Sequence, residues 1–132
     1  MSFPLQVAAM LMLDQCGYVA DPEHPVIGVF TDNTDVAVTS LLKQLVTTYS
    51  STPFVVSNEV VNGERMADSD FHSFHTNGYR VGYIAEGPVD DIVYGNSKHT
   101  AFDLPAGVNN SHAVQIGGAA TAFVLEMVLT QV

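Results

Sequence analysis

Two unbroken apolar runs of strand length, QVAAMLML at 6–13 and PVIGVF at 25–30, constrain this sequence more than any other feature. The first run ends at Asp14 and the second at the polar turn TDNTD. Apolar runs of this length, bounded by turn residues and lacking polar alternation, are typical of strands buried on both faces. We therefore expect both runs to be central strands of a sheet that helices cover on each side.

Two longer segments with helical spacing supply such helices. The first is expected to be capped by Asn33 or Thr34, to hold Asp35 in its first turn and to run to about Tyr49. The second is expected to begin near Ser111 and to lie across one face of the sheet. The expected inner side of the first helix comprises Val38, Leu41, Leu42, Leu45 and Val46, and that of the second comprises Ala113, Ile116, Ala120, Phe123, Val124 and Val128, with Gly117 and Gly118 permitting close packing.

Further elements continue the alternation of strands and helices. TPFVVS at 52–57 and YRVGYIAE at 79–86 have the composition of strands, and DFHSFHTN at 70–77 that of a short helix stopped by Gly78. A loop of about two dozen residues then precedes the last helix, and loops of that length are usually functional. The pattern predicts a single three-layer α/β domain over 1–132, with a mainly parallel, partly mixed sheet of about four or five strands flanked by three helices.

Charge and the first residues limit the classes of partner. Four Lys and Arg stand against fourteen Asp and Glu, and the net charge of −10 repels phosphate backbones and anionic lipid. We expect binding neither to nucleic acid nor to membranes. The apolar opening segment lacks a basic start and reaches Asp14 well short of a membrane span, so we expect no signal peptide. A single cysteine, Cys16, permits no intrachain disulfide, and we expect a cytoplasmic protein in which Cys16 is a small buried apolar residue.

Candidate chemistry lies at four places: Asp14, the segment 69–75, Glu86 and His99. Asp14 and Glu86 each follow a predicted strand, and ligands of α/β sheets gather outside the carboxyl ends of strands. Carboxylate and imidazole are ligands that suit zinc. The spacing also fits simpler roles: a turn residue at Asp14, a solvated acid at Glu86, a polar helix face in 69–75 and a solvated loop histidine at His99.

The order of these pieces resembles the two-zinc aminopeptidases of the bacterial and fungal leucyl type. In that family a strand ends in LD, a second ends in TD, and the segments SDHxxFxxxGYP, a strand ending in Glu, HTxxD and SH follow in order. The matching pieces here are Leu13 and Asp14, Thr31 and Asp32, SDFHSFHTNGYR at 69–80, Glu86, HTAFD at 99–103, and SHA from Ser111. The resemblance covers nearly the whole chain and implies half of a zinc aminopeptidase domain, the C-terminal half.

The resemblance also implies roles for individual residues. Asp14 matches the family's aspartate ligand of one zinc, and His99 matches the histidine ligand of the other. Residues expected to support these ligands in the same cleft are Ser69, Asp70, Glu86 and Asp103.

Several family residues have no counterpart in this sequence. The other histidine ligand, the bridging aspartate, a glutamate ligand and the glutamate base precede the LD strand in the family, whereas thirteen residues precede Asp14 here. Phe71 replaces the SDH histidine, and Arg80 stands at the usual proline. A catalytic zinc normally has three protein ligands. We therefore expect weak or absent zinc binding by the isolated chain and assign no catalytic residue; whether the chain is an enzyme stays open.

Three functions remain open at this stage. The chain could be part of a zinc aminopeptidase completed by a partner, a non-catalytic module that binds peptide, glycan or a cell surface in a lectin-like manner, or a regulatory piece that docks on a full-length relative. In each case the apolar surface left by the missing half should be covered, and we expect a homodimer or larger symmetric oligomer.

Overall fold

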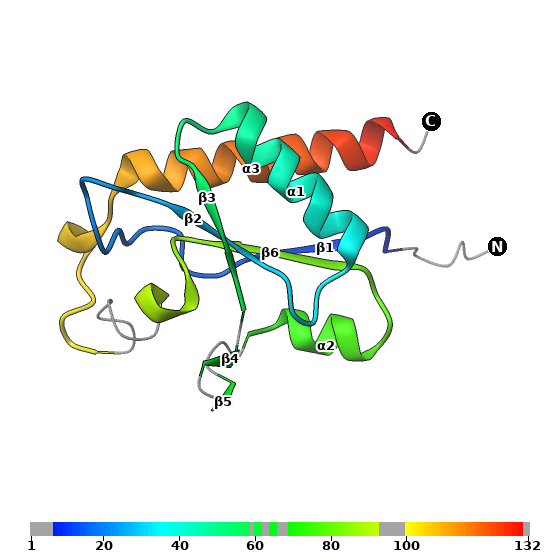
Figure 1. The fold of residues 1–132 in the computed structure, drawn as a ribbon, viewed down its shortest axis with the longest axis horizontal. Helices are drawn as coiled ribbons and strands as arrows, with labels where there is room; N and C mark the ends of the chain where they lie inside the picture. The colour runs from blue at the N-terminus through cyan, green and yellow to red at the C-terminus, as the bar shows by residue number, and fades with distance from the viewer. Residues whose placement is uncertain (1–6, 59, 62–63, 66–68, 93–99, 131–132) are drawn as a thin grey trace.

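The computed structural model describes residues 7–58, 60–61, 64–65, 69–92 and 100–130. Its centre is a four-stranded sheet with the strand order β1-β6-β2-β3 (Figure 1). The bounds of these strands are β1 Met10–Leu13, β6 Val81–Ala85, β2 Ile27–Phe30 and β3 Phe54–Ser57. The pairs β1–β6 and β2–β3 are parallel and the pair β2–β6 is antiparallel. The sheet is therefore mixed and mainly parallel, as predicted.

Helices cover both faces of this sheet. The helices α1, Val36–Tyr49, and α3, Asn110–Leu129, lie on one face, and α2, Phe71–Thr76, lies on the other (Figure 1). Other described elements are a small hairpin of β4, Val60–Val61, and β5, Glu64–Arg65, a helical turn at 89–92 within the predicted loop, and a 3-10 turn, Pro105–Gly107. The predicted three-layer α/β architecture is confirmed.

Alternation along the strands divides the core in two. Val29 and Ile84 point toward α1 and α3, where they pack with Leu42, Ile116 and Phe123. Their neighbours Phe30 and Tyr83 point toward α2 and stack with ring centroids 4.2 Å apart, and Phe71 of α2 packs against them. Both faces of the strands β2 and β6 are buried, which explains their lack of polar alternation.

The prediction that both apolar runs are central strands is half right. β2 is internal and fully buried, but β1 is an edge strand in the described sheet, and Leu13 is exposed. The composition of the two runs could not show which one is internal. An apolar run predicts that a strand is buried, but it does not predict whether a strand pairs with it on each side. The edge of β1 that faces away from β6 has no strand beside it among the described residues.

The predicted cap of the first helix was one or two residues too early. Asp35 is the N-cap, and its side chain accepts a hydrogen bond from the Val38 N–H at 2.9 Å. Asn33 adopts a left-handed conformation with φ 55° and forms the turn that leads into the helix. The predicted end at Tyr49 is confirmed.

The inner side of α3 also differs from the prediction. Ile116, Ala120 and Phe123 are buried as expected, but Val124 and Val128 are more than half exposed. A Cβ at Gly117 would meet no described atom within 4 Å, so this glycine is not at a close contact with the sheet. A nearly all-apolar helix carries no polar stripe to set its rotation, so tertiary packing decided which side faces the core. By length and composition alone α3 could cross a membrane; in the structure one side of it forms core.

Candidate functional site

The strand register brings Asp14 and Glu86 to the same end of the sheet. β1 and β6 are parallel, with Leu13 opposite Ile84. The residues that follow the two strands therefore lie at the same carboxyl-terminal end of the sheet. Asp14 is held there by Ser69, whose hydroxyl donates to the Asp14 Oδ2 at 2.8 Å across 55 residues of sequence. Two of the predicted site residues, Asp14 and Ser69, therefore meet directly.

Glu86 fixes the loop that follows Asp14. Its Oε2 accepts hydrogen bonds from the backbone N–H groups of Gly17, at 2.8 Å, and Tyr18, at 2.6 Å, and its own N–H donates to the Gln15 carbonyl at 2.8 Å. The residue is only 6% exposed. A buried carboxylate that accepts two backbone N–H groups positions the chain, which is a different role from that of a solvated acid.

The loop adopts a conformation that needs such support. Gln15 has φ 62°, in the left-handed region that residues with a Cβ seldom adopt. That conformation costs about 1 kcal/mol or more, and it is offset by the two hydrogen bonds that the Glu86 carboxylate accepts and the one that its N–H donates. The turn directs the chain away from the strand end directly after Asp14.

His112 joins the first turn of α3 to the same point. It is 3% exposed, and its Nε2 lies 2.9 Å from the backbone carbonyl of Glu86. Because a carbonyl oxygen only accepts, the hydrogen must lie on Nε2 of the ring. The other ring nitrogen, Nδ1, is buried and has no hydrogen-bond partner in the described part of the chain. The Asn109 N–H also donates to the Gly17 carbonyl at 2.6 Å, so α3 begins against the loop that Glu86 holds.

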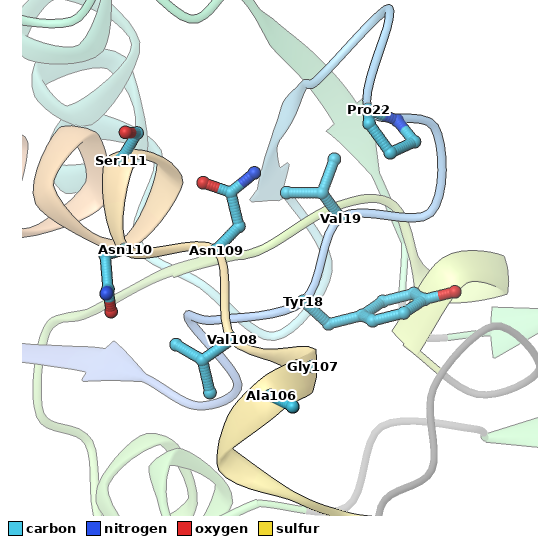
Figure 2. Close-up of a pocket in the computed structure, with 9 residues that line it drawn as sticks. All are labelled: Tyr18, Val19, Pro22, Ala106, Gly107, Val108, Asn109, Asn110 and Ser111. Atoms are coloured by element: carbon cyan, nitrogen blue, oxygen red, sulfur yellow. The ribbon is translucent and has the colours of Figure 1, made fainter.

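An open pocket of about 440 Å³ lies between this loop and the start of α3 (Figure 2). One wall comes from the segment 18–22 and the other from the segment 106–111, and the lining mixes apolar side chains with the polar groups of Tyr18, Asn109, Asn110 and Ser111. Its volume falls within the range of roughly 300–1,000 Å³ that small-molecule sites occupy. Glu86 ties both walls together, through its carboxylate on one side and its carbonyl on the other.

Cys16 lies in the same loop, in an environment that suppresses thiolate formation. Burial, together with the negative charges of Glu86 and Asp14, raises the pKa of the thiol from 9.0 to about 11. A thiolate is the reactive form of cysteine. Cys16 therefore lacks the character of a nucleophile, as predicted, but it is half-buried and not the fully buried residue that the sequence suggested.

We expect Cys16 to react slowly with iodoacetamide in the folded protein. A rise of two pKa units lowers the thiolate fraction about 100-fold at a given pH below 9. At pH 8 the folded protein should be labelled about 100-fold more slowly than the same protein in urea, as mass spectrometry would measure. The rate for the folded state should still be rising above pH 10. Equal rates in the folded and unfolded states would contradict the buried, negatively charged environment.

The other predicted site residues lie in less organised surroundings. Asp70 occupies the N-cap position of α2 but makes no side-chain capping bond, and it is exposed. Asp103 is exposed in the turn before the 3-10 segment, and its N–H donates to the Thr100 carbonyl. His99 lies outside the described residues. The zinc-ligand roles of Asp14 and His99 and the supporting roles of Ser69, Asp70, Glu86 and Asp103 stay predictions.

The described residues do not supply the donor set of a metal centre. Across the ranges that the structure describes, no three His, Cys, Asp or Glu side chains gather around a common point. Asp14 offers one carboxylate, which the Ser69 hydroxyl holds in position. The Oε2 atom of Glu86 already accepts backbone hydrogen bonds. The described chain alone does not fit a zinc site with three protein ligands.

His112 and the Gln15 turn were not predicted from the sequence. In the sequence His112 belongs to the predicted helix start SHA, and no local signal marks its contact with a carbonyl 26 residues earlier. The positive φ of Gln15 could not be predicted, because the residues that usually adopt positive φ are Gly, Asn and Asp. Both belong to the network around Glu86, and only the fold brings these residues together.

Comparison with known proteins identifies relatives of one kind. No protein-family profile matches the chain. It is 30% identical over 132 residues to leucine aminopeptidase 1 of Phaeosphaeria nodorum, a match that covers 95% of this chain and 31% of that protein. It is 36% identical over 80 residues to a probable aminopeptidase of Saccharomyces cerevisiae, covering 61% of this chain and 20% of that protein.

A solved structure gives the same answer. The LapA aminopeptidase of Legionella pneumophila superposes with a TM-score of 0.79 and 28% identity, covering 92% of this chain and 31% of that one. The chain thus spans about a third of the length of the relatives it matches. These matches confirm the aminopeptidase resemblance. In sequence and in fold, the chain corresponds to about one third of an aminopeptidase.

Proposed function

We propose that this chain is the part of a zinc aminopeptidase that carries the Asp14 and His99 ligand positions, and that it does not hydrolyse peptides by itself. The proposal rests on the arrangement around Asp14, at the carboxyl end of β1. Ser69 holds the Asp14 carboxylate, and Glu86 holds the loop that follows it. Among the described residues, no group of three possible metal ligands gathers there. The site therefore has a built framework but, in the part of the chain that the structure describes, fewer than the three protein ligands of a catalytic zinc.

The framework supports a metal-ligand role for Asp14. A hydroxyl that donates to one carboxylate oxygen restricts the side-chain rotamer, and outer-shell hydrogen bonds of this kind orient carboxylate ligands. When bound, a zinc ion would supply Lewis-acid chemistry to a peptide carbonyl. In this chain Asp14 would bind the ion, Ser69 would orient Asp14, and Glu86 would hold the adjoining loop.

The small number of metal donors among the described residues supports the proposed lack of catalysis by the chain alone. Loss of a general base alone commonly reduces a rate by about two to four orders of magnitude. Relatives that are about three times longer have polypeptide that could supply such groups. Under this proposal, activity requires a completing polypeptide, and the pocket beside Tyr18 and Ser111 is the remaining part of the substrate cleft.

The test is hydrolysis of leucyl-p-nitroanilide by the purified chain with added zinc. We expect no release of nitroaniline above the zinc-only blank, while full-length LapA aminopeptidase, assayed in parallel, serves as the active standard. Zinc titration by calorimetry should show weak binding that decreases in Asp14→Asn. Asp21→Asn is the matched control: it removes an exposed carboxylate that pairs with His24 and not with Ser69, and it should leave zinc binding unchanged.

Two results would contradict the proposal. Zinc-dependent turnover abolished by both Asp14→Asn and His99→Ala would show that the chain assembles a working site without another polypeptide. Zinc binding that is equal in the original protein, Asp14→Asn and Asp21→Asn would show that Asp14 is not a ligand.

A further inference from the structure

One position on the buried side of α3 is polar. The buried residues of this helix recur at helical spacing and are His112, Ile116, Ala119, Ala120 and Phe123. His112 is 3% exposed, and its Nδ1 atom has no hydrogen-bond partner in the described part of the chain. A buried polar atom without a partner costs free energy. Packing alone therefore does not account for a histidine at this position, and the contact of its other ring nitrogen supplies the reason.

His112 belongs to a closed ring of four hydrogen bonds. Its Nε2 donates to the Glu86 carbonyl at 2.9 Å, and the Glu86 carboxylate accepts from the Gly17 N–H at 2.8 Å. The Gly17 carbonyl in turn accepts from the Asn109 N–H at 2.6 Å. The Asn109 side chain closes the ring, because it accepts from the His112 N–H at 3.1 Å. The ring joins the start of α3, the end of β6 and the loop after β1.

The ring restrains the backbone next to Asp14. The Glu86 N–H donates to the carbonyl of Gln15, the residue that follows Asp14, at 2.8 Å. Ser69 restrains only the side chain of Asp14. The backbone N–H, the carbonyl and the carboxylate of Glu86 are thus all engaged, and a reorientation of Glu86 would shift the loop that begins at Asp14.

We propose that His112 is a positioning residue for Asp14: its Nε2–H holds Glu86, and Glu86 holds the loop that follows Asp14. The inference rests on the proposed function in one respect, the role of Asp14 as a metal ligand. The contact itself lies inside the described chain. His112 and Glu86 are only 3% and 6% exposed, so atoms of this chain already cover them, and the contact does not depend on any further polypeptide.

This role is indirect, and its expected size follows from that. Under the proposal His112 does not bind the metal, because its Nε2 is engaged by a carbonyl and its Nδ1 is buried. Hydrogen bonds that orient a metal ligand from outside commonly change metal affinity by about 10–100-fold when they are removed. A residue that served stability alone would change metal affinity only as far as it changed the folded fraction.

The test compares two substitutions at His112 with a control on the same side of α3. His112→Leu fills the position without a donor, whereas His112→Gln keeps an amide N–H that can reach the Glu86 carbonyl. Ile116→Val, one turn further along, weakens the packing of the same buried side and leaves the ring intact. Urea unfolding of each variant gives the change in global stability.

Amide hydrogen exchange of Gly17 and Tyr18 is the first measurement, because both N–H groups donate to the Glu86 carboxylate. We expect His112→Leu to speed their exchange about tenfold or more through local opening of the loop. His112→Gln should restore most of the protection, and Ile116→Val should change it only as far as global stability changes. Equal acceleration in His112→Leu and Ile116→Val at equal stability, or no recovery in His112→Gln, would overturn the proposal.

NMR of the imidazole nitrogens in the original protein needs no variant. It should find a hydrogen on Nε2 of His112, since a carbonyl oxygen only accepts. A ring that carries its hydrogen on Nδ1 alone would overturn the proposal even if every substitution prevented folding.

Zinc titration by calorimetry tests the link to Asp14. Binding should be about tenfold or more weaker in His112→Leu and close to that of the original protein in His112→Gln. An equal loss in both variants would overturn the positioning role, because the imidazole itself would then bind the metal. Zinc binding that Asp14→Asn leaves unchanged would contradict the proposed function. The amide exchange, which needs no metal, would still confirm or overturn the hold of His112 on the loop.

Discussion

Gly28→Ala is expected to destabilise the protein by about 3 kcal/mol or more. Gly28 lies in β2 between β3 and β6, opposite Val55 on one side and Ala85 on the other. A Cβ at this position would overlap the carbonyl oxygen of Gly87 and lie 2.7 Å from its carbonyl carbon. Backbone atoms cannot turn aside as a flexible side chain can, so the turn after β6 would have to move.

The displaced turn has further contacts that would be lost with it. Its first residue is Glu86, and two residues after Gly87 the buried N–H of Val89 donates to the Ser57 hydroxyl at 2.9 Å. Urea unfolding followed by circular dichroism measures the change, and a loss of 3 kcal/mol should also lower the Tm by more than about 8 °C. Gly107→Ala is the matched control, because a Cβ there meets nothing within 4 Å and the change should stay within about 0.5 kcal/mol. A stability of Gly28→Ala equal to that of Gly107→Ala would show that the turn after β6 does not pack on β2.

Glu86→Ala is expected to cost about 3 kcal/mol of stability. The substitution leaves the N–H groups of Gly17 and Tyr18 without their acceptor in a part-buried site, and each unsatisfied group costs about 1–3 kcal/mol. It also removes the restraint on the left-handed turn at Gln15. Glu86→Gln retains an acceptor oxygen without the charge and should fall between the original protein and the alanine variant. Glu23→Ala, an exposed glutamate outside the network, should have little effect on the urea midpoint.

A second readout separates loss of the loop from a general loss of stability. The negative charge of Glu86 helps to raise the pKa of Cys16, so Glu86→Ala should lower that pKa and speed alkylation of Cys16 under conditions where the protein is still folded. The same labelling in Gly107→Ala should stay slow. Unchanged alkylation in folded Glu86→Ala would mean that Glu86 does not hold this loop, and its role would then be limited to the contact of its backbone carbonyl with His112.

Strand and helix positions followed closely from the sequence, because they depend on local pattern. The run ending in Phe30 became a fully buried strand, the helix ended at Tyr49 as predicted, and the short helix after Asp70 stopped before the positive φ of Gly78. In each case residues within a few positions decide the outcome, through burial, capping or conformational freedom. The strand-end location of Asp14 and Glu86 followed for the same reason, and the parallel pairing of β1 and β6 confirmed that both lie at one end.

The sequence by itself therefore determined the α/β class, the order of its elements and the strand ends at which polar residues collect, since each depends on periodicity and turn chemistry within short segments. Only the tertiary structure decided that β1 is at the edge of the described sheet and that α3 turns Val128 outward. It also decided that Glu86 binds the backbone of residues 15–18 and that His112 binds the Glu86 carbonyl. These outcomes depend on contacts between residues as many as 69 positions apart. No local pattern encodes such contacts, because the partner is chosen by how the packed layers meet and not by neighbouring residues.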